Sequence, residues 1–509
     1  MFTGFGNTFI PGSRIGNRGR VAVIGELVVF LYFMFSFLLL PFGYNCLLLA
    51  YGASRYKAPE EKPLRRYPAV TVQLPIYNEG PIVEGLIDAV CAFRWPINRL
   101  EVQVLDDSTD ETRGIVDSAV QWYRVKGFNI RAVRRAGRLG YKAGALWNAF
   151  RQISGEYVAV LDADFLPGPD FLERTVPHLE ADSAVGFVQT RWGHLNRGLN
   201  KFTQAFAVAL DAHHMVDQAG RYTLGFLMSF NGSAGVFRAS AIRAAGGWSW
   251  DTMSEDMDLA TRVQLAGYRG VYLRNVVVPG LLPADLSAFR VQQARWAKGS
   301  IQCARKLLGR VYGSPLLSPF QKFQATMQLT NYSISLLMFM TALMGVMLLS
   351  YDAVFLTGLL PGTLFGRVIA DPRFGIMFTV CTLCTGVYYY TALSRQGISF
   401  RSKLPYIGLL ALVGHGISAV CAINILEGVL QEGGVFEKVP KYDVRGRLVN
   451  LGRRSYGSLK RFSGIESVLG ILCTMGLFFA VVHDGLPYAG FLAVYTLAYF
   501  SVSYWLGGV

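Results

Sequence analysis

The stretch YVAVLDAD, residues 157–164, decides the fold. It begins as an apolar strand-like run and ends in two carboxylates one residue apart, a pattern typical of a buried strand followed by a polar loop. Two similar runs precede it, AVTVQLP at residues 69–75 and VQVL at residues 102–105, and each ends in polar residues. Helix-like segments such as residues 81–93 separate the runs. This alternation predicts an α/β domain with a mostly parallel sheet, whose ligands bind at the carboxyl ends of the strands.

Apolar residues gather in two regions that flank this α/β segment. Of the 509 residues, 52% are hydrophobic and only 16% are charged, which is too apolar for an ordinary soluble enzyme. Residues 21–53 carry Glu26 as their only charge and exceed the roughly 20 residues that cross a bilayer. The sequence therefore predicts an integral membrane protein. Its expected parts are a short amino-terminal segment (1–20), a transmembrane helix (21–53), a soluble domain (54–285), amphipathic interface helices (286–322) and a membrane region (323–509).

The net charge of +15 raises the question of a nucleic-acid partner, but the basic residues are scattered along the chain. Much of the excess lies in short segments beside apolar runs, as is typical of membrane flanks. We therefore expect membrane lipids and no nucleic acid as partners. Cys381 and Cys384 form a CxxC pair, but inside a predicted membrane helix the packing of small residues is favoured over a redox or zinc site.

The positive-inside rule places residues 395–403 and 427–462 in the cytoplasm, because basic residues outnumber acidic ones in both. Residues 404–426 then cannot cross completely, and with Gly414-His415-Gly416 as a break they are predicted to be interfacial or re-entrant. A complete crossing there would change the count of spans. The simplest arrangement puts the soluble domain in the cytoplasm and has five spans, at residues 21–53, 323–351, 374–393, 467–483 and 485–509.

Four polar clusters stand in a fixed order across the middle of the chain. They are Asp106-Asp107, Asp162-Ala163-Asp164, Glu255-Asp256 and Gln292-Gln293-Ala294-Arg295-Trp296. Each has a purely structural explanation when taken alone. The aspartates can form Asx turns, the third cluster suits a helix amino terminus, and Trp296 suits an interfacial anchor.

The chemistry of the clusters fits glycosyl transfer from a nucleotide sugar. Asp162 and Asp164 suit Mg²⁺ or Mn²⁺, which take oxygen ligands and leave room for the oxygens of a diphosphate. A carboxylate such as Asp256 can act as a general base when an acceptor hydroxyl lies within hydrogen-bond reach. Trp296 offers a flat surface for a sugar ring, and Arg295 can pair with diphosphate oxygens.

Together the clusters resemble the D, DxD, (T)ED and QxxRW motifs of the processive membrane-bound family 2 glycosyltransferases. Longer strings extend the resemblance, among them VLDDSTDET (104–112), SEDMDLATR (254–262) and QQARWAKGS (292–300). They are closest to the cellulose-synthase-like mannan and glucan synthases of plants and their bacterial relatives. The resemblance is strong over about residues 70–310, and it implies a GT-A domain inserted between transmembrane helices.

The resemblance also implies a role for each residue of the site. Asp256, beside Glu255, would deprotonate the acceptor hydroxyl as that oxygen attacks the anomeric carbon, which inverts an α-linked donor to a β-linked product. The remaining implied groups are the nucleotide-sugar residues Tyr77, Glu79, Asp106 or Asp107, Lys142 and Asp162; the Mg²⁺ or Mn²⁺ ligands Asp162 and Asp164; and the acceptor and diphosphate residues Gln292, Arg295 and Trp296.

Three positions depart from the family pattern or need comment. The family's gating loop, FxVTxK, matches residues 436–441 only in its outer Phe and Lys, and a basic linker explains that segment equally well. Ser254 replaces the usual Thr before Glu-Asp and keeps the hydroxyl. His213 matches a family position, but we expect it to have a packing role.

The leading functional hypothesis is an inverting, processive β-glycosyltransferase. It would transfer a hexose from UDP-glucose or GDP-mannose to a growing β-glycan and pass the polymer across a bacterial inner membrane, or a Golgi membrane in a eukaryote. The alternative is a glycolipid synthase that adds one sugar to a lipid acceptor. A transporter or scaffold with a dead enzyme domain is disfavoured because every key carboxylate is present. The sequence leaves open the donor sugar, the linkage and any accessory subunits.

Overall fold

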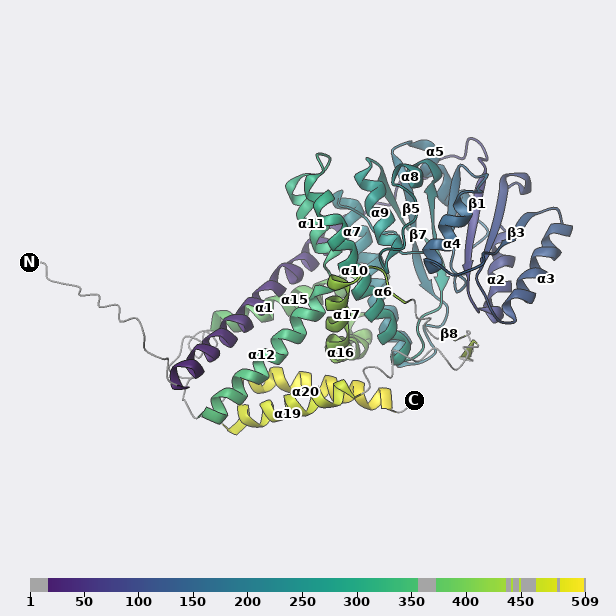
Figure 1. Cartoon of the computed structure of the whole chain (residues 1–509). Coiled ribbons are helices and arrows are strands. Elements are labelled where there is room, and N and C mark those ends of the chain that lie inside the picture. The colour runs from purple at the N-terminus through teal and green to yellow at the C-terminus, as the bar shows by residue number, and fades with distance from the viewer. Residues whose placement is uncertain are drawn as a thin grey trace, which may run out of the picture.

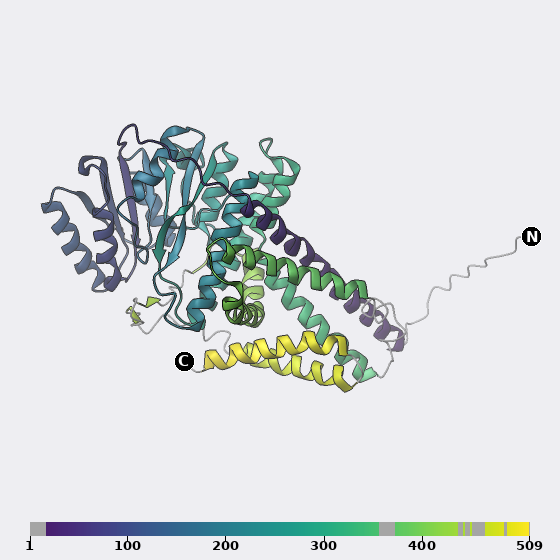
Figure 2. The same cartoon turned by 180° about the vertical axis from the view of Figure 1, so that it is seen from behind.

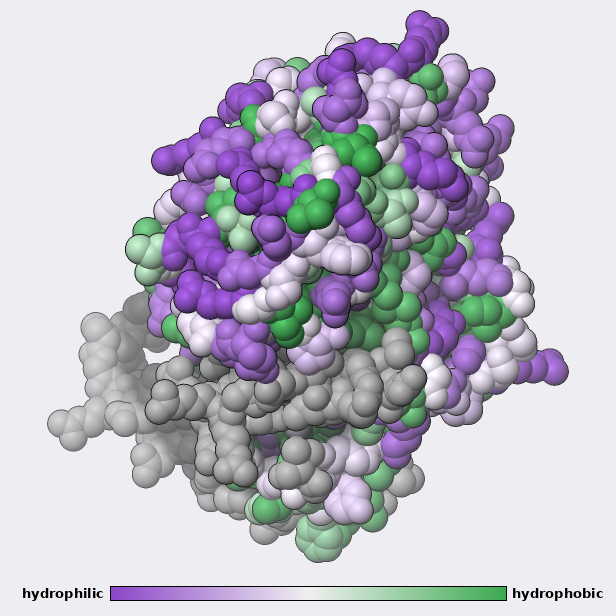
Figure 3. Space-filling model, turned by 90° about the vertical axis from the view of Figure 1, so that its right-hand side faces the viewer, coloured by the Kyte–Doolittle hydropathy of each residue, from purple (hydrophilic) through white to green (hydrophobic). Residues whose placement is uncertain are grey.

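The computed structural model describes residues 17–355, 372–435, 441–442, 448–449, 464–482 and 486–507. Within these residues, an α/β domain lies at one end of the molecule and long helices extend away from it (Figure 1). The view from behind shows the same division (Figure 2). One end of the α/β domain presents a largely hydrophilic surface with scattered apolar residues (Figure 3).

A seven-stranded sheet forms the centre of the α/β domain, in the order β3-β2-β1-β4-β6-β5-β7. Only β6 runs antiparallel to its neighbours, and the other pairings are parallel. The predicted mostly parallel sheet is therefore confirmed. The strands are β1 (Val70–Ile76), β2 (Leu100–Asp106), β3 (Asn129–Val133), β4 (Tyr157–Val160), β5 (Val185–His194), β6 (Gly235–Arg238) and β7 (Arg269–Gly280).

Helices cover both faces of this sheet, because successive side chains of a buried strand point to opposite sides. On β4, Tyr157 and Ala159 pack into one core, and Val158 and Val160 pack into the other. The first core is closed by α2 (Gly80–Cys91), α3 (Thr112–Val125) and α5 (Phe171–Ala181). The second is closed by α4 (Tyr141–Phe150), a π-helical turn (His213–Gln218), α7 (Ala219–Leu224), α8 (Ala239–Ala244) and α9 (Glu255–Leu265).

The helix α1 (Asn17–Ser54) anchors the α/β domain to the helical region. Its last turns insert Leu49, Ala50 and Ala53 into the second core, where all three are buried. Full burial of a leucine side chain contributes about 2 kcal/mol. Over Gly25–Ser54 this helix is long and apolar enough to cross a membrane. The domain is thus fixed directly to the end of a candidate membrane span.

Two further candidate spans are bent pairs of helices. Residues 323–351, expected as one span, are divided between α11 (Pro319–Leu329) and α12 (Ser333–Phe355), which meet at 66°. The Ser300 hydroxyl donates to the carbonyl of Leu329 at 2.7 Å and satisfies the end of α11. The other pair is α16 (Phe400–Gly416) and α17 (Ser418–Leu430), bent by 50° where the glycines predicted a break.

The remaining helices lie in the predicted apolar regions or connect them to the sheet. Residues 436–440 of the gating-like segment and the turn at 483–485 lie outside the described residues. The remaining elements are α6 (Lys201–Ala212), α10 (Leu286–Gly313), α15 (Pro372–Ser394), α19 (Ile465–Val482), α20 (Leu486–Gly507), a short turn (Ile97–Arg99), β8 (Lys441–Tyr442) and β9 (Leu448–Val449).

Candidate active site

A cleft of about 210 Å³ lies at the carboxyl ends of the parallel strands. The ends of β1 and β7 contribute Ile76 and Gly280 to its lining. All four sequence clusters reach this cleft, and of the predicted site residues only Asp106 does not line it. The predicted residues in its lining are Tyr77, Glu79, Asp107, Lys142, Asp162, Asp164, Glu255, Asp256, Gln292, Arg295 and Trp296.

The two adjacent aspartates at the end of β2 have different surroundings. Asp106 is buried, accepts a hydrogen bond from the backbone N–H of Ser108 at 3.0 Å, and pairs with Arg134 at 2.8 Å. This is the Asx-type turn that the sequence allowed, and it keeps the Asp106 side chain out of the lining of the cleft. Adjacent strand residues point to opposite sides. Asp107 is therefore the one that lines the cleft.

Two arginines that the sequence reasoning did not single out complete this wall of the cleft. Arg135 makes a two-point contact with the Asp107 carboxylate, at 2.9 and 2.5 Å. The Arg138 guanidinium lies 3.2 Å from the ring centroid of Tyr77 and 3.9 Å from Asp107. The basic run that follows β3 was the signal available in the sequence. We call Tyr77, Asp107, Arg138 and Lys142 the donor wall.

Lys142 links the donor wall to the acidic clusters. Its ammonium lies 2.5 Å from Asp162 and 3.9 Å from Glu255, and it donates to the carbonyl of Gly232 at 2.9 Å. Burial alone would lower the pKa of Lys142, but the neighbouring carboxylates outweigh burial and raise it. Lys142 therefore carries a full positive charge in the cleft.

Asp256 lies in the first turn of α9 and lines the cleft near Lys142 of the donor wall. One of its oxygens accepts a hydrogen bond from the backbone N–H of Met257 at 2.8 Å. Burial and repulsion from Glu255 raise the pKa of Asp256 to about 7, and Lys142 offsets only part of this rise. A carboxyl group with a pKa near neutrality is suited to proton transfer at physiological pH.

Gly232 is a further residue of the site, and the sequence did not single it out. Its φ of +84° is a conformation that side chains rarely adopt. A Cβ atom at this position would lie 2.9 Å from Asp256 Oδ2 and 3.5 Å from Lys142 Nζ. Only glycine therefore lets the backbone pass between the carboxylate and the ammonium.

The helix α10 carries Gln292, Arg295 and Trp296 on its first turns. Later turns of the same helix contact the segment that holds Asp256. Gly299 allows the contact, because a Cβ there would lie 2.1 Å from the Ser254 hydroxyl. Gln302 accepts a hydrogen bond from the backbone N–H of Met253 at 2.9 Å. Its amide nitrogen donates to the carbonyls of Gln431 and Gly433, at 3.0 and 2.7 Å.

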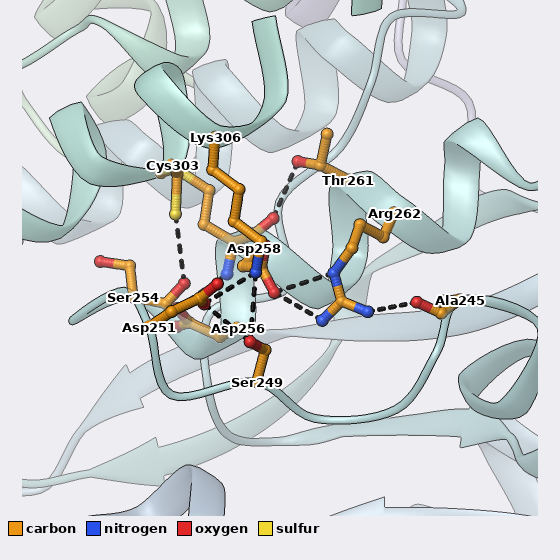
Figure 4. Close-up of polar contacts among 11 residues, drawn as sticks. Ala245, Ser249, Asp251, Ser254, Asp256, Asp258, Thr261, Arg262, Cys303 and Lys306 are labelled. Atoms are coloured by element: carbon orange, nitrogen blue, oxygen red, sulfur yellow. Dashed lines mark hydrogen bonds and ion pairs between the residues drawn. The ribbon is translucent and has the colours of Figure 1, made fainter. Parts of the chain in front are cut away.

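An ion network that is buried at Asp258 and Arg262 and partly exposed at Asp251 and Lys306 holds the same segment (Figure 4). Lys306 of α10 contacts Asp251 at 2.7 Å and Asp258 at 2.9 Å, and Arg262 pairs with Asp258 at 2.5 Å. The Asp258 side chain is fully buried, so both cations are needed to compensate its charge. We call the segment from Ser249 to Asp258, together with α10, the base wall.

The pair Asp162 and Asp164 is suited to a divalent cation. Both carboxylates line the cleft, and Asp162 is held by a hydrogen bond from its backbone N–H to the Ser233 hydroxyl at 2.9 Å. No group of three or more His, Cys, Asp or Glu residues that could hold a metal occurs in the described part of the chain. One or two carboxylates with phosphate oxygens and water are the usual environment of Mg²⁺. The residues present therefore fit a cation shared with a bound diphosphate.

His213 has a supporting contact at the edge of the cleft. Its Nε2 lies 3.2 Å from Asn231 Oδ1, and its Nδ1 lies 3.6 Å from Asp217. Asn231 lines the cleft, whereas His213 does not. His213 thus holds Asn231 through a polar contact from outside the cleft lining, and its packing role stays a prediction.

Comparisons with known proteins identify the family to which the chain belongs. Residues 71–230 match the model of glycosyl transferase family 2, and residues 157–390 match that of glycosyl transferase family group 2. Glucomannan 4-beta-mannosyltransferase 1 of Oryza sativa subsp. japonica is 35% identical over 359 residues, which cover 68% of this chain and 67% of the rice protein. Glucomannan 4-beta-mannosyltransferase 7 of Arabidopsis thaliana is 41% identical over 262 residues, or 50% of this chain.

The chain spans about half the length of this curated relative, because the match covers 47% of the Arabidopsis protein. Among solved structures, the mannosyltransferase PcManGT from Pyrobaculum calidifontis in complex with GDP-Man and Mn²⁺ is similar, with a TM-score of 0.45 and 21% identity. That similarity covers 73% of this chain and 97% of PcManGT.

Proposed function

The chain belongs to glycosyl transferase family 2, and from this premise we propose that it is an inverting hexosyltransferase that builds a β-linked glycan at a membrane. The observation that carries the proposal is the convergence of all four clusters on one cleft, whose lining includes Asp256, a carboxyl group with a pKa of about 7. GDP-mannose is the proposed donor, because the relatives named above are mannosyltransferases. UDP-glucose is the second candidate.

The donor wall is proposed to hold the nucleoside diphosphate. The Tyr77 ring, already stacked against Arg138, offers a surface for the nucleoside, and Asp107 offers acceptors to its hydroxyl groups. Lys142 and Arg295 supply positive charge for the diphosphate. Binding the donor thus places its anomeric carbon between this wall and Asp256.

Asp256 is proposed as the general base. Its carboxylate takes the proton of the acceptor hydroxyl while that oxygen forms a bond to the anomeric carbon. The bond from the anomeric carbon to the diphosphate breaks, and its electron pair leaves with the nucleoside diphosphate. Attack from the face opposite the diphosphate converts an α-linked donor into a β-linked product. The raised pKa of Asp256 supports this role, because a more basic carboxylate is a stronger proton acceptor.

Asp162 and Asp164 are the proposed ligands of a divalent cation. When bound, Mg²⁺ or Mn²⁺ neutralises charge that develops on the leaving diphosphate. Removing the cation with a chelator should abolish turnover, and adding back Mn²⁺ or Mg²⁺ should restore it. Turnover that persists after chelation would remove the cation from the proposal.

Gln292, Arg295 and Trp296 are proposed to hold the acceptor end of the glycan at the junction with the helical region. Because α10 leads from the cleft toward α11 and α12, a growing chain would leave the site beside the apolar helices (Figure 1). This supports elongation at the cytoplasmic face coupled to passage across the membrane. Accessory subunits are not required by this scheme.

Purified full-length protein, incubated with radiolabelled GDP-mannose or UDP-glucose, tests the proposal. We expect release of nucleoside diphosphate from one donor, together with label in ethanol-insoluble material that an endo-β-mannanase or endo-β-glucanase degrades. Label confined to an organic extract would instead identify a glycolipid synthase. No release from any nucleotide sugar would contradict hexosyl transfer altogether.

A further inference from the structure

Three arginine side chains lie near one another where the α/β domain joins the ends of α1 and α15. Arg191 lies on β5, Arg274 lies on β7, and Arg395 directly follows α15. Arg191 Nη1 donates to Gln396 Oε1 at 3.4 Å, and Arg395 Nη2 donates to the carbonyl of Ser54, the last residue of α1, at 2.6 Å. The three side chains therefore come from segments far apart in the sequence.

Tyr56, two residues beyond α1, holds the position of the third arginine. The Arg274 guanidinium lies 4.3 Å from the Tyr56 ring centroid. The Tyr56 hydroxyl donates to the carbonyl of Tyr272 at 2.9 Å and accepts from the backbone N–H of Arg274 at 3.2 Å. A stacked guanidinium on an anchored ring is preorganised, so little side-chain entropy is lost when it binds a further group.

This arginine cluster is separate from the catalytic cleft. Trp192 lines the cleft, and the neighbouring Arg191 does not. Adjacent residues of a strand point to opposite faces of the sheet. Arg274 and Arg395 are likewise absent from the lining of the cleft. A ligand of the cluster would thus not compete with a sugar donor.

The positive charge of the cluster is not compensated within the described residues. Of the ion pairs formed there, none involves Arg191, Arg274 or Arg395. Arg191 Nε and Arg274 Nη1 are buried and have no hydrogen-bond acceptor in the same part of the chain. Burial, together with repulsion from Arg395 and Arg191, lowers the pKa of Arg274. Leaving a buried charged donor without an acceptor destabilises the folded protein.

We propose that Arg191, Arg274 and Arg395 form a binding site for a phosphate group, outside the catalytic cleft. Phosphate oxygens would supply the acceptors that the two buried nitrogens lack and the negative charge that the cluster lacks. The guanidinium fork matches two phosphate oxygens at once. The site lies at the end of the apolar helix α1, so the phosphate of an anionic lipid head group is the favoured source.

The test uses the full chain, purified in an uncharged detergent and freed of lipid. Three probes are titrated separately: phosphatidylglycerol, dioleoylglycerol as a lipid without phosphate, and inorganic phosphate. The midpoint of thermal unfolding and native mass spectrometry report binding, and neither readout requires turnover, so the result does not depend on the proposed function. The variants are Arg274→Gln, Arg395→Gln and the control Arg55→Gln, which is an exposed arginine at the same edge that stacks on Tyr51.

We expect phosphatidylglycerol to raise the unfolding midpoint of the wild type in a saturable way, and dioleoylglycerol to have no effect. Arg395→Gln and Arg274→Gln should weaken phosphatidylglycerol binding about tenfold, whereas Arg55→Gln should change it less than twofold. Without any anion, Arg395→Gln should unfold at the same or a higher temperature than the wild type, because repulsion is relieved. A merely structural arginine would instead destabilise the protein when removed.

Inorganic phosphate separates the two sources of the ligand. If it saturates the site and displaces phosphatidylglycerol, the natural ligand is a free phosphate compound; if it does neither, the ligand is a lipid head group. Equal binding of phosphatidylglycerol by the wild type and Arg395→Gln would overturn the proposal. So would an equal loss in Arg55→Gln, because general surface charge would then explain the effect. Arg395 is exposed, so this variant keeps the test decisive even if Arg274→Gln does not fold.

Discussion

The donor wall and the base wall of the cleft are built in different ways. On the donor wall, charges are compensated at short range, as in the contact of Asp107 with Arg135 and of Lys142 with Asp162. On the base wall, the compensated carboxylates are Asp251 and Asp258, which do not line the cleft and whose contacts are drawn in Figure 4. Asp256 faces the cleft beside Glu255 and has a pKa raised to about 7.

This difference separates binding from chemistry. A wall with paired charges can hold a charged ligand by exchanging partners. On the base wall, ion pairs hold the backbone in place and one carboxyl group, that of Asp256, is poorly compensated. That carboxyl group is therefore the one suited to proton transfer. Changes on the base wall should therefore alter the rate of the chemical step, and changes on the donor wall should alter donor affinity.

The largest effect is expected from Asp256→Asn. The amide cannot accept the proton of the acceptor hydroxyl, so kcat should fall by about 10²–10⁴-fold with little change in the donor KM. Release of nucleoside diphosphate measured over a range of donor concentrations separates the two constants. Polymer synthesis by Asp256→Asn at the wild-type rate would show that Asp256 is not the base. It would also contradict the proposed difference between the two walls.

The pH dependence of the wild type should follow the deprotonated fraction of Asp256. Because its pKa is raised, the base form is lost as the pH falls through about 7, and kcat/KM should drop about tenfold per unit below that value. Glu255→Gln removes a repelling charge, so it should lower the pKa of Asp256 and move the acidic limb to lower pH. A limb that stays in place in Glu255→Gln would show that another group titrates.

Gln302→Met should have an intermediate effect on kcat, because it changes only the position of the segment that carries Asp256. The change leaves the backbone N–H of Met253 without its acceptor and removes the bonds to Gln431 and Gly433. A displaced Asp256 segment should lower kcat about tenfold and leave the donor KM within about twofold.

The matched control for Gln302→Met is Ser300→Ala on the same helix. It also removes one buried hydrogen bond, but toward Leu329 and away from the base wall. Both variants should lose similar thermal stability, and only Gln302→Met should lose kcat. If kcat falls equally in both variants, Gln302 contributes only to the stability of the fold and does not position Asp256.

The smallest effect is expected on the donor wall, from Arg138→Gln. Loss of the guanidinium that stacks on Tyr77 should raise the donor KM about threefold to tenfold and leave kcat within about twofold, since a cation–π contact contributes about 0.5–2 kcal/mol. Arg134→Gln is the control, because it pairs with Asp106 behind the cleft. It should lower stability and leave the donor KM unchanged. A fall in kcat for Arg138→Gln would contradict the assignment of donor binding, rather than the chemical step, to the donor wall.

The sequence predicted most of the residues that line the cleft, but not how they are arranged. Strand-end residues such as Asp162 and Asp164 follow directly from apolar runs, because parallel strands bring their carboxyl ends to one edge. The choice between Asp106 and Asp107 depended on which side chain points out of the sheet. The contributions of Arg138 and Gly232 depended on a stacked ring and a close approach that have no signature in residue type alone.

The sequence by itself determined the α/β class, the order of the four clusters and the apolar helix α1, because these depend on local patterns of side chains along the chain. The tertiary structure decided which carboxyl group has a raised pKa, how α10 is fastened to the Asp256 segment, and that three arginines lie near one another at the end of α1. Those features depend on burial and on distances between residues far apart in the chain. Such distances are set by packing of the whole domain, which no local pattern specifies.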